Sequence, residues 1–263
     1  MIESGDGGFF RLEDGLLTAN DAARGPWSAD ACHGGPVTGL VARALEQVLP
    51  HKQLVRLTLN FRRPVPMLGL TVTAAVDRDG REVAIGSAEV RSEAGICVTA
   101  SSVHIAPQVR TDLPTAFRPH PDFSKAGPGE FQLRHAPHGQ PFFSSGVEVA
   151  YPPGETLAPG PTTVWMRTLP IVAGEVPSPF QSLCPLADCG NAVSRNAEFT
   201  EAIFINPDLT IAVFRPPESD WLASEAMSHW QPNGVGMSQA QLFDVKGAVG
   251  FALQTLLVRP ITK

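Results

Sequence analysis

Two patterns of hydrophobic and polar positions predict the elements of the first half of the chain. Residues 36–48 carry apolar side chains at the i, i+3, i+4 and i+7 spacing of a helix with one buried face, and Pro36 suits the first helical position. Residues 54–62, LVRLTLNFR, alternate apolar and polar side chains, which is typical of a strand with one buried face. Residues 70–105 continue as three strands joined by glycine-containing turns. We therefore expect one helix followed by an antiparallel sheet.

The second half of the chain repeats this order of elements. A helix is expected within LADCGNAVSRNAEF, residues 186–199, and strands follow it. The two halves align when Arg63 is set on Arg215. Gly95 and Gly247 then fall at the same distance, 32 residues, after these arginines. Two copies of one helix-and-sheet unit explain this correspondence.

The repeat suggests where the units begin and end. The 263 residues are enough for two units, which we place at 1–106 and 163–263. The stretch 107–162 between them contains eleven prolines and no sustained period, and we predict that it is a linker. Its HAPH sequence, residues 135–138, has a spacing that two metal ligands could use, but its irregular setting favours a surface loop. We expect neither a metal nor an organic cofactor.

Composition and charge narrow the classes of protein. A formal net charge of -6 argues against an extended nucleic-acid-binding surface. No uncharged run approaches the roughly 18 residues of a membrane span, and the first residues do not resemble a signal peptide, so a soluble cytoplasmic protein is expected. The four cysteines lack both CxxC spacing and a disulfide-rich density, which favours free thiols.

A His-Gly-Gly-Pro sequence stands where the first helix is predicted to begin. Gly34 and Gly35 have no Cβ atom, so another backbone or a ligand could come close to the helix start, whose free N–H groups favour negative charge. A tight turn that needs positive φ is the alternative explanation. This stretch alone leaves both explanations open.

Several stretches of the sequence resemble the acyl-CoA thioesterase II family, in particular its bacterial thioesterase-like branch. They lie in both halves and are GPWSADACHGGPVTGLVARALEQ, LNFRRPVP, LADCGNAVS, FINPDLTIAVFRPP and GFALQTLLV. The resemblance implies an α+β fold, a tandem (double) hotdog in which each unit is a central helix wrapped by a curved antiparallel sheet. It also implies hydrolysis of an acyl-CoA thioester by a water molecule that an Asp, a hydroxyl residue and a Gln of the second unit orient.

Transferred onto this sequence, the implied carboxylate falls on Asp208, seven positions before the Arg of the FRP turn, and the implied amide falls on Gln254. The alternatives are a turn-forming Asp after Pro207 and a strand-edge Gln that faces solvent. The hydroxyl position admits Ser228 or His229. Only one of these two can point into the site, because adjacent strand residues face opposite sides.

The resemblance also brings the helix start of the first unit toward the second unit. His33, Gly34 and Gly35 are therefore expected to bind the oxyanion or the substrate near Asp208. A β-branched residue in place of Gly35 should then lower turnover more than stability. Asp188 is expected to cap or line the start of the second helix, where it could also contact the substrate.

Two other functions compete with thioester hydrolysis. A hotdog hydratase would carry a D-x-N-x-x-H pattern, but no His follows Asp188 and Asn191 at that spacing. A non-catalytic acyl-CoA-binding protein would use the same fold without hydrolysis. The sequence leaves open whether the thiol carrier is coenzyme A or a carrier protein, which acyl chain is bound, and whether the chain is a monomer or a homodimer.

Overall fold

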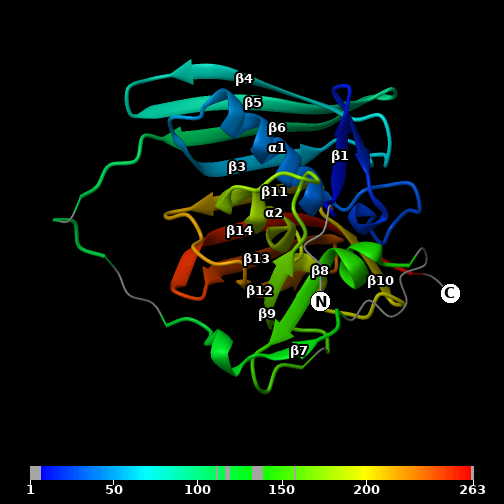
Figure 1. Cartoon of the computed structure of the whole chain (residues 1–263). Helices are drawn as coiled ribbons and strands as arrows, with labels where there is room; N and C mark the ends of the chain where they lie inside the picture. The colour runs from blue at the N-terminus through cyan, green and yellow to red at the C-terminus, as the bar shows by residue number, and fades with distance from the viewer. Residues whose placement is uncertain (1–6, 111, 116–118, 132–138, 157, 262–263) are drawn as a thin grey trace.

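One large antiparallel sheet runs through the molecule and joins the two halves of the chain (Figure 1). The computed structural model describes residues 7–110, 112–115, 119–131, 139–156 and 158–261. The strands of the first half in this sheet are β3 (Gln53–Phe61), β4 (Thr71–Asp79), β5 (Val83–Ser92) and β6 (Gly95–Ile105). Those of the second half are β7 (Gly127–Gly129), β8 (Val147–Tyr151), β9 (Thr162–Thr168), β10 (Ala202–Ile205), β11 (Asp208–Val213), β12 (Leu222–Trp230), β13 (Val235–Asp244) and β14 (Gly247–Pro260). The strand order is β4-β5-β6-β3-β11-β14-β13-β12-β9-β8-β7, and β10 pairs with β14.

The central pairing of the sheet relates the two halves by an approximate twofold axis. In the antiparallel pair β3 and β11, Thr58 stands opposite Thr210, and their hydroxyl oxygens lie 3.1 Å apart. On the far sides, Thr58 pairs with Ser101 of β6, and Thr210 pairs with Leu253 of β14. Ser101 and Leu253 are separated along the chain by the same number of residues as Thr58 and Thr210, and as the aligned Arg63 and Arg215. The repeated pattern in the sequence therefore corresponds to a repeated strand register.

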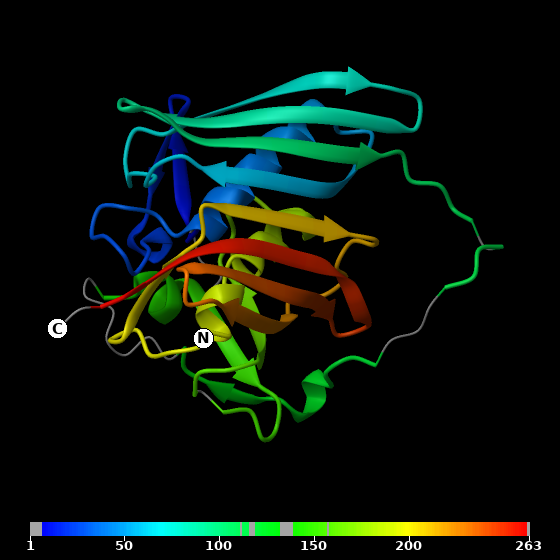
Figure 2. The same cartoon turned by 180° about the vertical axis from the view of Figure 1, so that it is seen from behind.

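The α-helices of the described residues lie on one face of this sheet, as the two opposite views show (Figures 1 and 2). They are α1 (Gly34–Val48), α2 (Pro179–Ala187) and α3 (Gly190–Val193). The first of them packs on β3, β4 and β5 and also on α2, while α3 packs on β12, β13 and β14. Val37, Leu40 and Leu45 of α1 are fully buried in this layer, in agreement with the predicted helix face. An α+β arrangement results, as predicted.

Short elements complete the fold. A separate two-stranded sheet consists of β1 (Phe10–Glu13) and β2 (Leu16–Ala19). The short helical turns are η1 (Asp21–Ala23), η2 (Phe123–Lys125) and η3 (Phe142–Gly146).

Among the described residues, none of the helices combines the length and hydrophobicity that a membrane crossing requires.

The second helix begins earlier than predicted and is broken. Ser178 caps α2 by accepting a hydrogen bond from the backbone N–H of Gln181 at 3.1 Å, and Pro179 follows as the first helical residue. Pro185 lies inside α2, which ends two residues later, and α3 resumes at Gly190. The helix that was expected within residues 186–199 therefore begins at Pro179, earlier than predicted. A proline is compatible with the first turn of a helix, so Pro179 does not prevent this start.

The stretch predicted as a linker, 107–162, contributes strands to the sheet. Its strands β7 and β8 pair with each other at one edge of the sheet, and β8 also pairs with β9, which begins at the last residue of this stretch. Val147 and Val149 are buried, so β8 has the alternation of a half-buried strand that the surrounding prolines obscured. The residues after β6 arc away from the body of the molecule (Figures 1 and 2). The HAPH sequence lies outside the described residues.

Candidate functional site

A buried carboxyl group stands at the break between α2 and α3. Asp188 is the C-cap residue of α2 and is 5% exposed. Its Oδ1 accepts hydrogen bonds from the side-chain amides of Asn206, at 2.9 Å, and Gln254, at 3.1 Å. Its Oδ2 lies 3.2 Å from Nδ1 of His33. Two amides therefore hold one carboxyl oxygen, and the other faces an imidazole.

Gln254 reaches this carboxyl group from the core face of β14, where it is buried in an otherwise apolar strand. Its Nε2 also donates to the Asp188 carbonyl oxygen at 3.1 Å, and its Oε1 accepts from the backbone N–H of Asn191 at 3.1 Å. Both ends of the amide are thus engaged, as a buried amide requires. Gln254 fixes the position of the helix break and of the carboxyl group together.

Asn206 reaches the same carboxyl group from the residues just before β11. Its Nδ2 also donates to the backbone carbonyl of Asp208 at 3.1 Å, and its Oδ1 accepts from Nδ2 of Asn191 at 3.4 Å. The side chain is therefore oriented from both ends. An amide in this place can hold a carboxylate or a water molecule, but it does not pass on a proton as a hydroxyl group can.

His33 comes from the first half of the chain and is the N-cap residue of α1. Its Nδ1 accepts a hydrogen bond from the backbone N–H of Gly35 at 3.1 Å, so this nitrogen carries no proton. Its ring stacks on Phe142 with centroids 4.0 Å apart. Burial lowers the pKa of His33 to about 3. At neutral pH the imidazole is neutral, so it can accept a hydrogen bond from the protonated Asp188 carboxyl group but does not form an ion pair with it.

The acidity of Asp188 is strongly perturbed. Burial raises the pKa of Asp188 to about 7, against the opposing effect of hydrogen bonds from Asn206, Gln254 and the Gly35 N–H, which favour the ionised form. The carboxyl group can thus gain or lose a proton near neutral pH. A general base needs this property, and such groups cluster at functional sites.

The two glycines of the His-Gly-Gly-Pro sequence allow two different close contacts. A Cβ atom on Gly34 would lie 2.8 Å from Oδ2 of Asp188 and 2.9 Å from the Phe61 ring, whereas a Cβ atom on Gly35 would lie 2.7 Å from Cα of Pro185. Both glycines are helical and neither has positive φ, so the tight-turn explanation is wrong. Gly34 makes room beside the carboxyl group, and Gly35 makes room for the backbone of α2.

An apolar cavity of about 500 Å³ opens onto this carboxyl group. Its polar lining includes His33, Asp188, Asn191 and Asn206. Much of the remaining lining is aromatic and consists of Trp27, Phe61, Phe143, Phe199 and Phe204. A concave, mostly apolar cavity with a few convergent polar groups is the usual form of a small-molecule site.

The structure places the residues expected from the sequence in different positions. Gln254, His33 and Gly34 meet at the Asp188 cluster. Asp208 is turned outward with Thr210, and its Oδ1 accepts from the backbone N–H of Thr255 at 2.7 Å on the other face of the sheet.

The two candidates for the hydroxyl position also lie apart from the cluster. Ser228 is buried on the core face of β12, where its hydroxyl pairs with that of Ser194 at 2.8 Å. The neighbouring His229 is exposed on the outer face. The structure therefore does not bring Asp208, Ser228 or His229 to Gln254.

Sequence reasoning did not assign Asn206 to the site, and it gave Asp188 as a residue that caps or lines a helix start and could also contact the substrate. The sequence feature that could have identified Asp188 is the interruption from Pro185 to Gly190 in an otherwise apolar helix. At such a break, a carboxyl group that caps the helix can point away from the helix surface. The signal for Asn206 is weaker. An Asn before Pro207 at the start of a strand is also a common turn residue.

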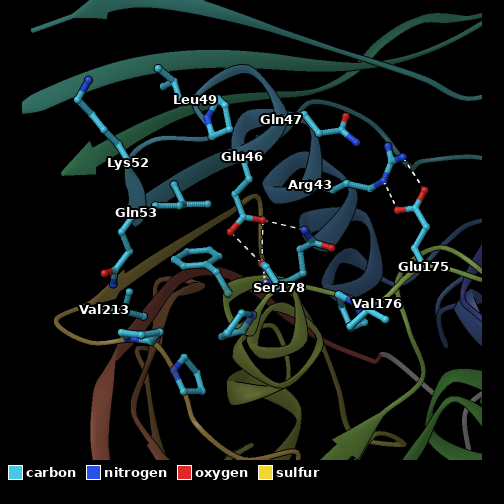
Figure 3. A pocket seen from close by; sticks show the side chains of 18 residues that line it. Arg43, Glu46, Gln47, Leu49, Lys52, Gln53, Glu175, Val176, Ser178 and Val213 are labelled. Atoms are coloured by element: carbon cyan, nitrogen blue, oxygen red, sulfur yellow. Dashed lines mark hydrogen bonds and ion pairs between the residues drawn. The ribbon is translucent and has the colours of Figure 1, made fainter. Parts of the chain in front are cut away.

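A second cavity, of about 560 Å³, lies at the opposite ends of α1 and α2 (Figure 3). There the Glu46 carboxylate accepts hydrogen bonds from Oγ of Ser178 at 2.8 Å and from Nε2 of Gln181 at 2.7 Å. Arg43 forms an ion pair with Glu175 at 2.6 Å. A carboxylate at the N-terminus of α2 stabilises that helix, so these contacts join the two helices. The Asp188 cavity is the better candidate, because it combines an apolar wall with a proton-exchanging group.

Comparison with known proteins gives one family and one fold. The family model of the acyl-CoA thioesterase C-terminal domain matches residues 114–258, and that of the N-terminal domain matches residues 23–105. No curated protein matches the sequence.

Solved structures share the overall arrangement at low sequence identity. A candidate thioesterase from Novosphingobium aromaticivorans has a TM-score of 0.75 at 18% identity, over 95% of this chain and 98% of that chain. A hot dog fold protein of unknown function from Alicyclobacillus acidocaldarius has a TM-score of 0.70 at 16% identity, over 100% and 98% of the two chains. An acyl-CoA thioesterase II from Mycobacterium marinum has a TM-score of 0.63 at 18% identity, over 100% and 99%. These likenesses concern the fold alone.

Proposed function

This chain belongs to the acyl-CoA thioesterase family, and from that premise we propose that it hydrolyses an acyl-CoA thioester at Asp188. The observation that carries the proposal is the buried Asp188 carboxyl group, with a pKa of about 7, held by Asn206 and Gln254 beside an apolar cavity. A general base is most effective when its pKa lies near the working pH. We also propose that the two halves are the two units of a tandem hotdog, joined through β3 and β11, and that residues 107–162 connect them.

The proposed reaction uses the ionised form of Asp188. Oδ1 is held by two amide donors, which leaves Oδ2 to take a proton from a water molecule in the cavity. The oxygen of that water forms a bond to the thioester carbonyl carbon, the carbon–sulfur bond then breaks, and the thiol leaves with a proton from Asp188. His33 Nδ1, 3.2 Å from Oδ2, accepts a hydrogen bond from the carboxyl group while it is protonated.

The developing oxyanion requires a donor near the same oxygen. Gly34 lines the cavity at the first turn of α1, where backbone N–H groups have no intrahelical partner. We assign the oxyanion contact to the Gly34 N–H, because the Gly35 N–H is engaged by His33. His33 then positions Asp188, and Gly35 contributes through helix packing.

Asn206 favours a second candidate function, the binding of an acyl-CoA without hydrolysis. Ser228 and His229, the two candidates for the implied hydroxyl position, lie apart from the carboxyl group, and the amide of Asn206, which cannot relay a proton, stands beside it. In the hydrolase, Asp188 takes the proton from water and returns it to the leaving thiol itself, so the reaction needs no hydroxyl group to relay it. In a binding protein, the same cluster would only fix the thioester.

Thiol release separates the two candidates. Wild type and Asp188→Asn are assayed with acyl-CoA thioesters, and binding to both proteins is measured by calorimetry with non-hydrolysable thioether analogues. The proposal predicts release by wild type and a loss of at least about 100-fold in the variant, the scale expected for removal of a general base, with binding retained. Binding without release by wild type would establish the binding protein instead.

A further inference from the structure

We propose that the acyl group accepted by this site is a compact aromatic one, an aryl or arylalkyl group, and not a long straight chain. The inference rests on the proposed function, because it places the acyl group of the thioester in the Asp188 cavity. It is based on the aromatic side chains that line the cavity and on the positions at which the cavity ends.

The cavity wall contains a cluster of aromatic side chains from two separate loops and a strand. Trp27 precedes α1, Phe199 follows α3, and Phe204 belongs to β10. The centroid of Trp27 lies 5.6 Å from that of Phe204 with the rings at 87°, and Phe199 lies 4.9 Å from Phe204. These are the edge-on and tilted arrangements that aromatic rings prefer. A further ring fits such a cluster by the same geometry.

Trp27 has free surface for such a ring. Its side chain is 37% exposed, although Phe204 beside it is fully buried and Phe199 is half-buried. An exposed indole next to a binding cavity offers an apolar face that a ligand can cover. The three rings are uncharged, so the contacts that they offer an acyl group are apolar and aromatic.

The cavity ends before it could hold a long chain along the helix. Among the described lining residues, Gly34 is the only member of α1. Beyond Gly34, the side chains of Val37, Leu40 and Val41 are at most 1% exposed. These side chains therefore fill the layer between α1 and the sheet.

Beneath the carboxyl group, the other direction is filled as well. A Cβ atom on Gly190 would lie 3.0 Å from Oγ of Ser238 and 3.2 Å from Oε1 of Gln254. An alkyl chain would need to pass this contact to run beneath α3. By contrast, a cavity of about 150 Å³ is sufficient for a benzene ring, so the observed 500 Å³ accommodates an aryl ring together with the thioester.

The test compares acyl groups of equal carbon number. Phenylacetyl-CoA and octanoyl-CoA each carry eight acyl carbons, and palmitoyl-CoA adds the long chain. We expect kcat/KM for phenylacetyl-CoA to exceed both others at least tenfold. Phe199→Leu should lower kcat/KM for phenylacetyl-CoA at least fivefold and change that for octanoyl-CoA less than twofold, because leucine keeps the apolar volume and removes the ring. Phe214→Leu, at an exposed position that does not line the cavity, is the matched control and should change neither value.

The outcomes distinguish this inference from the proposed function. Thiol release with octanoyl-CoA or palmitoyl-CoA as the better substrate would overturn the aromatic preference and leave the hydrolase in place. If no thioester is hydrolysed, the proposed function fails, and the preference is decided by calorimetry with S-(2-phenylethyl)-CoA and S-octyl-CoA. Tighter binding of the phenylethyl thioether supports the inference, and equal or weaker binding overturns it.

Discussion

A single carboxyl group determines how this site responds to pH. Asp188 must be ionised to accept a proton, and burial raises its pKa to about 7. Asn206 and Gln254 donate to its Oδ1, and these hydrogen bonds favour the ionised form. The buried environment and the two amides therefore act in opposite directions on one titration.

The first prediction concerns the rate as a function of pH. The kcat/KM of the wild type should rise with pH and reach half of its plateau near pH 7, because the ionised form of Asp188 is the active one. Asn206→Ala removes a hydrogen bond to the ionised form and should move this midpoint upward by about 0.5 to 1 pH unit. Thiol release measured from pH 5 to pH 9 gives both midpoints. A midpoint that stays in place or moves downward in the variant would contradict the role of Asn206.

The second prediction concerns stability. Asp188 binds its proton more tightly in the folded protein, so its contribution to stability is fully present below about pH 4 and is lost as pH rises through about 7. Asp188→Asn cannot ionise. Its free energy of unfolding relative to wild type should therefore increase between pH 4 and pH 7, by roughly 4 kcal/mol in total, since one pKa unit corresponds to about 1.4 kcal/mol. Urea unfolding at several pH values measures the difference, which should not vary with pH if Asp188 titrates normally.

At the scale of elements, the start of α1 separates catalytic and structural roles in adjacent residues. Gly34 lies against Oδ2 of Asp188, and Gly35 lies against the backbone of Pro185 in α2. The early expectation for Gly35, a larger effect on turnover than on stability, therefore has to be reversed. A side chain at residue 35 would push two helices apart.

A pair of alanine variants tests this separation. Gly35→Ala should lower the free energy of unfolding by about 1 to 3 kcal/mol, the usual cost of overpacking, because the Pro185 backbone cannot yield as a side chain does. Gly34→Ala should instead reduce kcat by at least tenfold, because its Cβ atom would meet the carboxyl group. Urea unfolding and thiol release on both variants give the comparison. Equal effects of the two variants on stability and rate would refute the assignment.

The local patterns of the sequence predicted much of the fold but only part of the site. The strand from residue 54 and the first helix followed from simple periodicity, because each buries one continuous face. Asp208 lies outside the site because it shares strand parity with the outward-facing Thr210, whereas Gln254 faces the core. Asp188 acquires its environment only when β14, α1 and the residues before β11 meet around it. Such convergence depends on tertiary contacts that no local pattern records.

At the scale of the molecule, the site combines groups from both halves of the chain. His33 and Gly34 come from the first half, and Asp188, Asn206 and Gln254 come from the second. The pairing of β3 with β11 and the packing of α1 on α2 hold these groups together. From the segment that connects the halves, Phe142 stacks on His33 and Phe143 lines the cavity, whereas the described residues directly after β6, 106–110, do neither.

This arrangement predicts that the connecting segment can be cut. Val109 is 95% exposed in the stretch that leaves β6, so a protease recognition sequence inserted there can be cleaved without loss of core contacts. The two fragments should stay associated through β3 and β11 and should retain most of the thioesterase activity. Size-exclusion chromatography and thiol release before and after cleavage provide the test. Separation of the fragments in native buffer would show that the connection is needed to hold the sheet together.

The central claim is that Asp188, and not Asp208, is the base. The most direct test is kcat/KM for one acyl-CoA substrate in Asp188→Asn and Asp208→Asn, two isosteric changes that each remove one carboxylate. The structure predicts a loss of at least about 100-fold for Asp188→Asn and less than about threefold for Asp208→Asn, whose carboxylate only accepts from the Thr255 N–H on the outer face. A large loss in the Asp208 variant with activity retained in the Asp188 variant would contradict the claim.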